Sequence, residues 1–163
     1  MTGKADFSGD EWARLKRAPF IAGMAISLAD PGGPIELVKE TAATLKTVRE
    51  AAESGGRGEL VDAVAHEAVA DARQRENPLK DFKAKGALAG QEILEELTEV
   101  NRVVSAKATP EEAEAYRDWL QAAAQEAANA AKEGGFLGFR AEQVSEGEQR
   151  MLDKLAEVLV PPA

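Results

Sequence analysis

Apolar side chains recur every three or four positions over most of this chain, and glycine or proline separates one such stretch from the next. The clearest example spans residues 34–54. Its apolar stripe consists of Val38, Thr41, Leu45, Val48 and Ala52. This spacing is typical of amphipathic helices, whereas strands alternate every second residue. We therefore predict an all-α fold, a single compact bundle of about seven helices.

Length and charge narrow the class of protein further. A chain of 163 residues, 44% of them apolar, can bury one core of ordinary size. We expect one domain over residues 1–163, with residues 1–7 and 160–163 frayed. Alanine contributes 32 residues, which favours closely packed helices. The 29 acidic residues exceed the 20 Lys and Arg and give a net charge of −9, so we expect the surface to repel nucleic acid.

The sequence also indicates where the protein works. Its longest uncharged apolar run, residues 18–29, is 12 residues long, and crossing a bilayer takes about 20. The first ten residues lack the apolar segment of a secretory signal. There is no cysteine, so neither disulfides nor thiolate chemistry can contribute. We expect a cytoplasmic protein that binds neither membranes nor nucleic acid.

A capping box opens the first predicted helix. Ser8 and Glu11 have the spacing at which each side chain bonds the other residue's backbone N–H, and Phe7 and Trp12 occupy the positions of a hydrophobic staple. We expect this helix to cover residues 9–17.

Pro19 is predicted to end or kink that helix. Residues 20–28 contain large apolar and small residues and no polar face, which predicts a buried helix at the centre of the bundle. The other helices are expected at about residues 34–54, 59–75, 85–106, 110–133 and 146–159. Thr109 with Glu112, and Ser145 with Glu148, form two further capping boxes.

Two of these helices have faces made of glycine or alanine, which carry little side-chain volume. Gly86 and Gly90 lie on the apolar stripe of the helix at residues 85–106, and seven alanines fall between positions 122 and 131. Surfaces with so little side-chain volume need a close neighbour, either another helix of the chain or a second copy of it. We expect a homodimer or a complex with an unidentified protein partner.

His66 is the only histidine, and it follows Asp62 by one helical turn. A carboxylate and an imidazole at this spacing can hold a metal or move a proton. A zinc site needs further ligands, so we expect a surface pair. Four glutamates lie on the outer side of the helix at residues 85–106: Glu92, Glu95, Glu96 and Glu99. They alternate with its apolar stripe and are expected to form a solvated acidic face.

No catalytic motif is present in the sequence. There is no Gly-x-Ser-x-Gly turn, and residues 55–58 lack the spacing and the following Lys-Ser/Thr of a phosphate-binding loop. Nothing distinguishes two carboxylates as an acid and base pair. We expect a protein that is not an enzyme and that uses no cofactor.

Residues 134–144 form a glycine-rich connection that is apolar where loops are normally polar. Phe136, Leu137 and Phe139 can fold over an open end of the bundle or stand out as a docking hook. Exposed aromatic residues reduce solubility, which favours the first arrangement. The second makes these three residues candidate contacts with a partner.

The chain resembles a family of small bacterial all-helical proteins with no assigned activity. The resemblance covers nearly the whole length and rests on Glu11-Trp12, Leu15, Ala18-Pro19, Ala29-Asp30-Pro31, Lys39-Glu40, Ala108-Thr109-Pro110-Glu111-Glu112, Gly134-Gly135-Phe136-Leu137-Gly138-Phe139 and Val144-Ser145-Glu146. It implies an all-helical fold and no particular chemistry.

The C-terminal residues are also similar to TerB-like tellurite-resistance proteins, through residues 144–148 and the leucines after them. That resemblance implies a role in metal stress and an acidic loop that holds a metal. Residues 139–143 stand at the place of that loop and contain one acid, Glu142, and one arginine, Arg140. Our expectation is a non-catalytic protein with an interaction or stress-related role, and the alternative is a carboxylate-based metal-binding protein of the TerB-like type.

Overall fold

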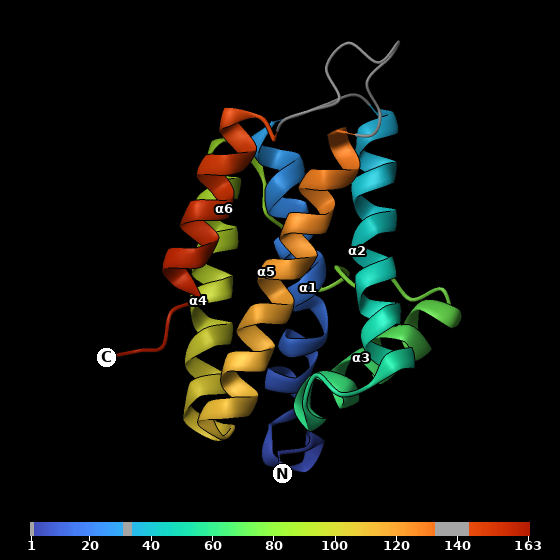
Figure 1. Ribbon diagram of the computed structural model, residues 1–163, viewed down its shortest axis with the longest axis vertical. Coiled ribbons are helices and arrows are strands. Elements are labelled where there is room, and N and C mark those ends of the chain that lie inside the picture. The colour runs from blue at the N-terminus through green and yellow to red at the C-terminus, as the bar shows by residue number, and fades with distance from the viewer. Residues whose placement is uncertain (1, 31–33, 133–143) are drawn as a thin grey trace.

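The computed structural model describes residues 2–30, 34–132 and 144–163, and within these ranges the chain forms six α-helices and no strand (Figure 1). The helices are α1 (Gly9–Ala29), α2 (Pro34–Ser54), α3 (Glu59–Arg73), α4 (Ala89–Lys107), α5 (Pro110–Lys132) and α6 (Glu146–Val158). Two 3₁₀ turns, η1 (Lys4–Asp6) and η2 (Gly86–Leu88), precede α1 and α4. The all-α prediction is confirmed.

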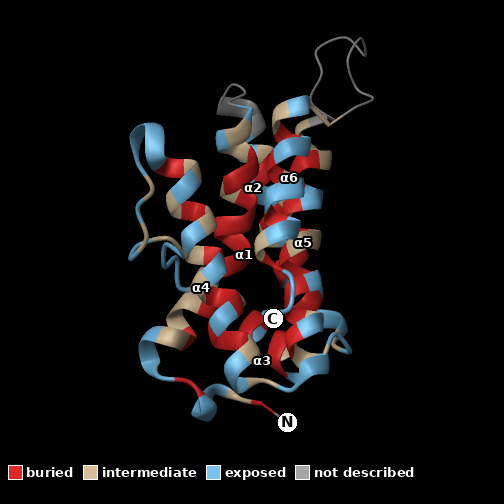
Figure 2. Ribbon diagram, turned by 90° about the vertical axis from the view of Figure 1, so that its left-hand side faces the viewer, coloured by how far each residue is buried: buried red, intermediate tan, exposed pale blue. Residues whose placement is uncertain are grey.

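Helix α1 lies at the centre of the bundle and contacts each of the other five α-helices. Its buried face includes Leu15, Ile21 and Ile26, which are inaccessible to solvent. Figure 2 shows that the buried residues of the surrounding helices gather on their inward faces. The prediction of a buried central helix is confirmed for this part of the chain, but that helix is longer than expected.

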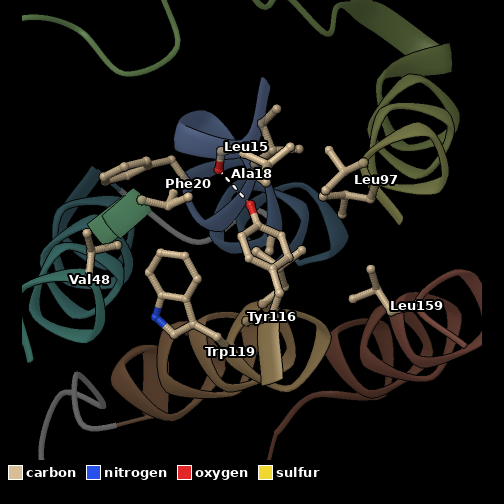
Figure 3. Close-up of a cluster of buried hydrophobic side chains, with 14 of the residues drawn as sticks. Leu15, Ala18, Phe20, Val48, Leu97, Tyr116, Trp119 and Leu159 are labelled. Atoms are coloured by element: carbon tan, nitrogen blue, oxygen red, sulfur yellow. Dashed lines mark hydrogen bonds between the residues drawn. The ribbon is translucent and has the colours of Figure 1, made fainter. Parts of the chain in front are cut away.

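The predicted end of the first helix at residue 17, before Pro19, is wrong, because α1 continues from Gly9 to Ala29. A proline inside a helix leaves the carbonyl four residues earlier without its donor, and here that carbonyl belongs to Leu15. The hydroxyl of Tyr116 in α5 donates a hydrogen bond to the Leu15 oxygen at 2.7 Å (Figure 3). Tyr116 is fully buried, so a second helix supplies the donor that Pro19 lacks.

All three capping boxes are present. Their reciprocal bonds measure 2.7 and 3.2 Å for Ser8 with Glu11, 3.1 and 3.2 Å for Thr109 with Glu112, and 2.8 and 3.2 Å for Ser145 with Glu148. The Phe7 and Trp12 rings are 5.7 Å apart, as the staple predicts.

Among the described N-terminal residues, Thr2 is docked against α5 rather than frayed. Thr2 is buried, and its backbone N–H and hydroxyl both donate to the Glu112 carboxylate at the start of α5, the first at 2.9 Å. Burial raises the pKa of Glu112, but the bonds from Thr2 and from the Thr109 backbone outweigh it and lower the pKa to about 2.

Helix α2 buries Val48 and Ala52 of the predicted stripe, but its first half is rotated relative to that stripe. Val38 is 68% exposed and Thr41 is also exposed, whereas Thr44 and Glu40 are buried. The cause is a close approach to α1, where a Cβ on Gly23 would overlap the Thr44 hydroxyl. Only a small side chain fits against Gly23, so the polar side of α2 faces inward there.

Three smaller corrections concern other helices. Leu28, expected inside the bundle, is 43% exposed at the end of α1. Gly86 lies outside α4 in the turn η2 with φ of +67°, and Gly90 alone faces α6, near Met151. The sequence pattern places Ala156 on the inner face of the helix at residues 146–159, but in α6 Ala156 is exposed and Met151 takes a buried position.

The alanine-rich half of α5 has the close neighbour that it requires within the same chain. Helix α5 packs along α2 and α1, and four of its alanines are inaccessible to solvent: Ala123, Ala124, Ala127 and Ala128.

Candidate binding groove

A groove runs between α1, α2 and the α3–α4 connection (residues 74–85). It comprises two adjoining cavities of about 380 and 230 Å³, which share Phe20, Thr41 and the Asn77-Pro78 turn. The connection leaves the end of α3 and passes α2 on its way to α4 (Figure 1). Cavities of this size suit a small ligand or the side chains of a docked peptide.

The floor of the groove is apolar. Phe20 from α1 and Ala68 from α3 are buried, and Leu45 from α2 and Ala72 from α3 are partly exposed to the cavity. Burial of apolar surface is the main favourable term in most protein association, so this floor can supply binding energy.

The rim of the groove is charged, and most of its charges are paired. Lys16 bonds Asp71 at 2.6 Å, Arg17 bonds Glu96 at 2.9 Å, and Lys80 bonds Glu76 at 3.1 Å. The hydrogen bond and charge of Glu76 raise the pKa of Lys80.

Two rim residues, Arg75 and Asp81, form no ion pair with any residue that the structure describes. Arg75 also has a backbone φ of +59°, the one positive value of a non-glycine residue in the described chain. It follows the C-cap of α3, where Glu76 N–H donates to Asp71 O at 3.0 Å and Arg75 N–H to Ala72 O at 3.0 Å. Glycine is usual at this position because a side chain costs about 1–2 kcal/mol there.

The α3–α4 connection forms one wall of the groove, and turns hold it in place. The Asn77 side-chain oxygen accepts from Leu79 N–H at 2.9 Å, and Phe82 N–H donates to the Leu79 oxygen at 3.1 Å. An Asx turn of this kind fixes the local backbone. The groove is therefore formed before any ligand arrives.

The smaller cavity of the groove is lined by three hydroxyl groups, each of which already donates a hydrogen bond within the protein. Ser27 donates to the buried Glu40 carboxylate, Thr44 to the Glu40 carbonyl at 3.0 Å, and Thr41 to the Leu37 carbonyl at 2.8 Å. Their oxygens remain available only as acceptors.

His66 and Asp62, the pair expected from the sequence, are not joined by a hydrogen bond or an ion pair in the described structure. His66 is exposed on α3. Asp62 accepts from the backbone N–H of Gly56 at 3.1 Å, and its other carboxylate oxygen is buried without a partner. Asp62 therefore holds the α2–α3 loop.

The four glutamates of α4 do not all face water. Glu95 is exposed and Glu99 pairs with Arg102 at 2.6 Å, as a solvated face requires. Glu96 is largely covered and binds Arg14 at 2.8 Å and Arg17 at 2.9 Å, so it joins α4 to α1. The expectation of a solvated face is wrong for Glu96, because two cations of α1 lie opposite it.

Phe136, Leu137 and Phe139 lie outside the described residues, as do residues 139–143 at the place of the TerB-like loop. Among the residues that the structure does describe, no three His, Asp or Glu side chains gather into a metal site. Across the same ranges, every helix is too short or too polar to cross a bilayer.

Sequence reasoning missed the residues that form the groove. Asn77-Pro78 ends the helical pattern of the residues before it, and this pair also carries an Asx-turn signal. Glu40 and Thr44 fall one turn apart in a helix assumed to bury its apolar side, and nothing local marks them as inward-facing.

Comparison with known proteins found no match to this chain among family models, curated proteins or solved structures.

Proposed function

We propose that the protein acts by binding a protein partner, without catalysis, and that the groove between α1, α2 and the α3–α4 connection is where the partner docks. The partner segment is an amphipathic helix with an apolar face for the floor and an acidic residue opposite Arg75. Helix-in-groove recognition of this kind relies on apolar anchors spaced along one face of the peptide.

The proposal is supported chiefly by the position of Arg75 at the rim of the groove and by its backbone conformation. Arg75 forms no ion pair with the residues that the structure describes, lies beside an apolar floor, and has a left-handed backbone conformation that opposes folding. Strained residues persist where the surroundings force them, and they cluster at binding sites. In a chain with an excess of acids, an unpaired arginine beside an apolar cavity favours an acidic partner.

We propose in addition that the protein works in the cytoplasm. The lack of cysteine agrees with a reducing compartment such as the cytoplasm. A second copy of the chain and a metal ion, the other expectations from the sequence, enter the experiment as competing outcomes.

The test uses two labelled helical peptides of about 16 residues, long enough for roughly 24 Å of helix. They share a leucine face, and their outer faces carry glutamate in one and lysine in the other. Fluorescence anisotropy should give a Kd at least about tenfold lower for the acidic peptide. Arg75→Glu should reverse the preference, whereas Arg57→Glu, an equal charge change in the exposed α2–α3 loop, should leave it intact.

A preference that survives Arg75→Glu, or absence of binding by both peptides at millimolar concentration, would refute the proposal. Light scattering of the protein alone detects self-association. A melting shift on adding Ca²⁺, Mg²⁺ or Zn²⁺ without peptide would instead support the metal-binding alternative, because a ligand of the folded state stabilises it.

A further inference from the structure

A second cavity, of about 540 Å³, lies between the ends of α4 and α6 and the first half of α5. It shares no lining residue with the groove. In Figure 1, α4 and α6 lie on the left of the bundle, and α2 and α3 lie on the right. Its walls are mostly apolar and include Ala113, Leu159 and Pro161.

Arg117 of α5 lines this cavity although its side chain is buried, with 7% of the residue exposed. Its one hydrogen bond in the described structure is weak, from Nη1 to the Ser105 hydroxyl at 3.3 Å. No described carboxylate lies within ion-pair distance of it. Burying an arginine without a counter-ion carries a large desolvation cost, and such charges are normally paired.

The guanidinium is open to the cavity. Each guanidinium nitrogen of Arg117 that lacks a hydrogen-bond partner in the described structure is accessible to solvent. A guanidinium presents five N–H donors in a plane that matches a carboxylate, and Ser105 takes one of them. At least one edge of the fork therefore remains for a ligand.

Polar contacts hold the cavity in shape. The Ser105 hydroxyl also donates to the Asn101 side-chain oxygen at 3.3 Å, and Asn101 Nδ2 donates to the Val158 and Val160 carbonyls at 3.0 and 2.6 Å. This chain of bonds ties α4, α5, the last residue of α6 and the residues after it around Arg117. The site is built before a ligand enters it.

Two acids, Glu114 and Asp118, line the mouth of the cavity without pairing with Arg117. They repel a doubly charged phosphate more strongly than a singly charged carboxylate, and the single buried cation matches one negative charge. The apolar walls add a requirement for a hydrocarbon body.

We infer that this cavity binds a small organic carboxylate, with its oxygens on the Arg117 guanidinium and its apolar body against Leu159 and Pro161. The same chemistry is offered by an aliphatic acid and by an apolar amino acid. The amino acid would in addition place its ammonium group near Glu114 and Asp118.

The test measures binding of hexanoate, leucine, hexanamide and inorganic phosphate by calorimetry and by melting temperature. We expect hexanoate or leucine to bind saturably with a Kd at or below about 1 mM, and hexanamide and phosphate to bind at least about tenfold more weakly. Tighter binding of leucine, weakened by Glu114→Gln, identifies an amino acid as the ligand. Equal binding of hexanamide and hexanoate, or binding of neither hexanoate nor leucine, overturns the inference.

Arg117→Met removes the charge and keeps an unbranched side chain of somewhat smaller volume. We expect it to abolish the ligand effect and to leave the free protein as stable or more stable, because the unpaired charge is gone. Should Arg117→Met fail to fold, Arg117→Lys provides the second test, since it keeps the charge but loses the planar fork. We expect at least about tenfold weaker hexanoate binding for Arg117→Lys, and unchanged binding by either variant contradicts the inference.

Discussion

The Tyr116 hydroxyl donates to the Leu15 carbonyl at 2.7 Å, and that carbonyl is the one that Pro19 leaves without a helical donor. This bond explains how α1 continues through a proline at the centre of the bundle. It also makes the stability of α1 depend on a side chain that is 101 residues away in the sequence.

Tyr116→Phe should therefore destabilise the protein by about 1–3 kcal/mol, since it leaves a buried carbonyl without a donor. In a Pro19→Ala background the alanine N–H can serve Leu15, and the cost of Tyr116→Phe should fall below about 1 kcal/mol. Urea unfolding of the four proteins in this double-mutant cycle measures the coupling. Equal costs in both backgrounds would show that the two residues act independently.

The same tyrosine should resist alkaline titration in the folded protein. Burial raises the pKa of Tyr116 well above its ordinary value of 10. Its folded pKa exceeds the unfolded one, so its contribution to stability is complete below about pH 10 and is lost as the pH rises above that value. Because the chain has one tyrosine, phenolate absorbance reports this group alone. We expect absorbance to rise together with loss of helical dichroism, and phenolate formation in a folded protein would contradict this.

Acid should release the N-terminal residues. The pKa of Glu112 is about 2 in the folded chain against an ordinary value of 4.5. Its contribution is therefore complete above about pH 4.5 and is lost as the pH falls toward 2. We expect a loss on the order of 1–2 kcal/mol, reduced by solvent screening of this partly exposed group.

Glu112→Gln is the matched control for that pH effect. It keeps an acceptor oxygen for Thr2 but does not titrate, so the difference in stability between the two proteins should shrink at about pH 3 compared with about pH 6. A difference that stays constant over this range would mean that Glu112 does not carry the acid sensitivity.

Gly23→Ala should destabilise the bundle by about 1–3 kcal/mol, although alanine is the better helix former. The added methyl group would overlap the Thr44 hydroxyl where α1 meets α2. Thr44→Ala should recover part of the loss in the double variant. Gly9→Ala provides the control, because a Cβ there has no neighbour within 4 Å, and thermal unfolding should show little change or a slight gain.

Local signals in the sequence identified the helix starts, because a capping box lies within four residues and both partners are visible. Ser8, Thr109 and Ser145 all begin helices as predicted. The sequence indicates an end or a kink at Pro19, because Tyr116, whose hydroxyl replaces the missing donor, belongs to another element.

The groove could not be predicted for a related reason. Its apolar floor combines Phe20 of α1, Leu45 of α2 and Ala68 of α3, which come together only through the packing of three helices. The inward position of Thr44 is set by its contact with Gly23 rather than by the hydropathy of α2. The conformation of Arg75 is set by the end of α3, where the sequence has no glycine to indicate a left-handed residue.

We expect Arg75 to serve binding at the expense of stability, and Arg75→Gly tests this claim when the free energy of unfolding and the Kd for the acidic peptide are measured on the same sample. Glycine relieves the left-handed backbone, so the free energy of unfolding should rise by about 0.5–1 kcal/mol, while the Kd for the acidic peptide rises about tenfold. Arg75→Ala should weaken binding equally without the gain in stability. A less stable Arg75→Gly protein, or one that binds the acidic peptide as tightly as the parent chain, would contradict the claim.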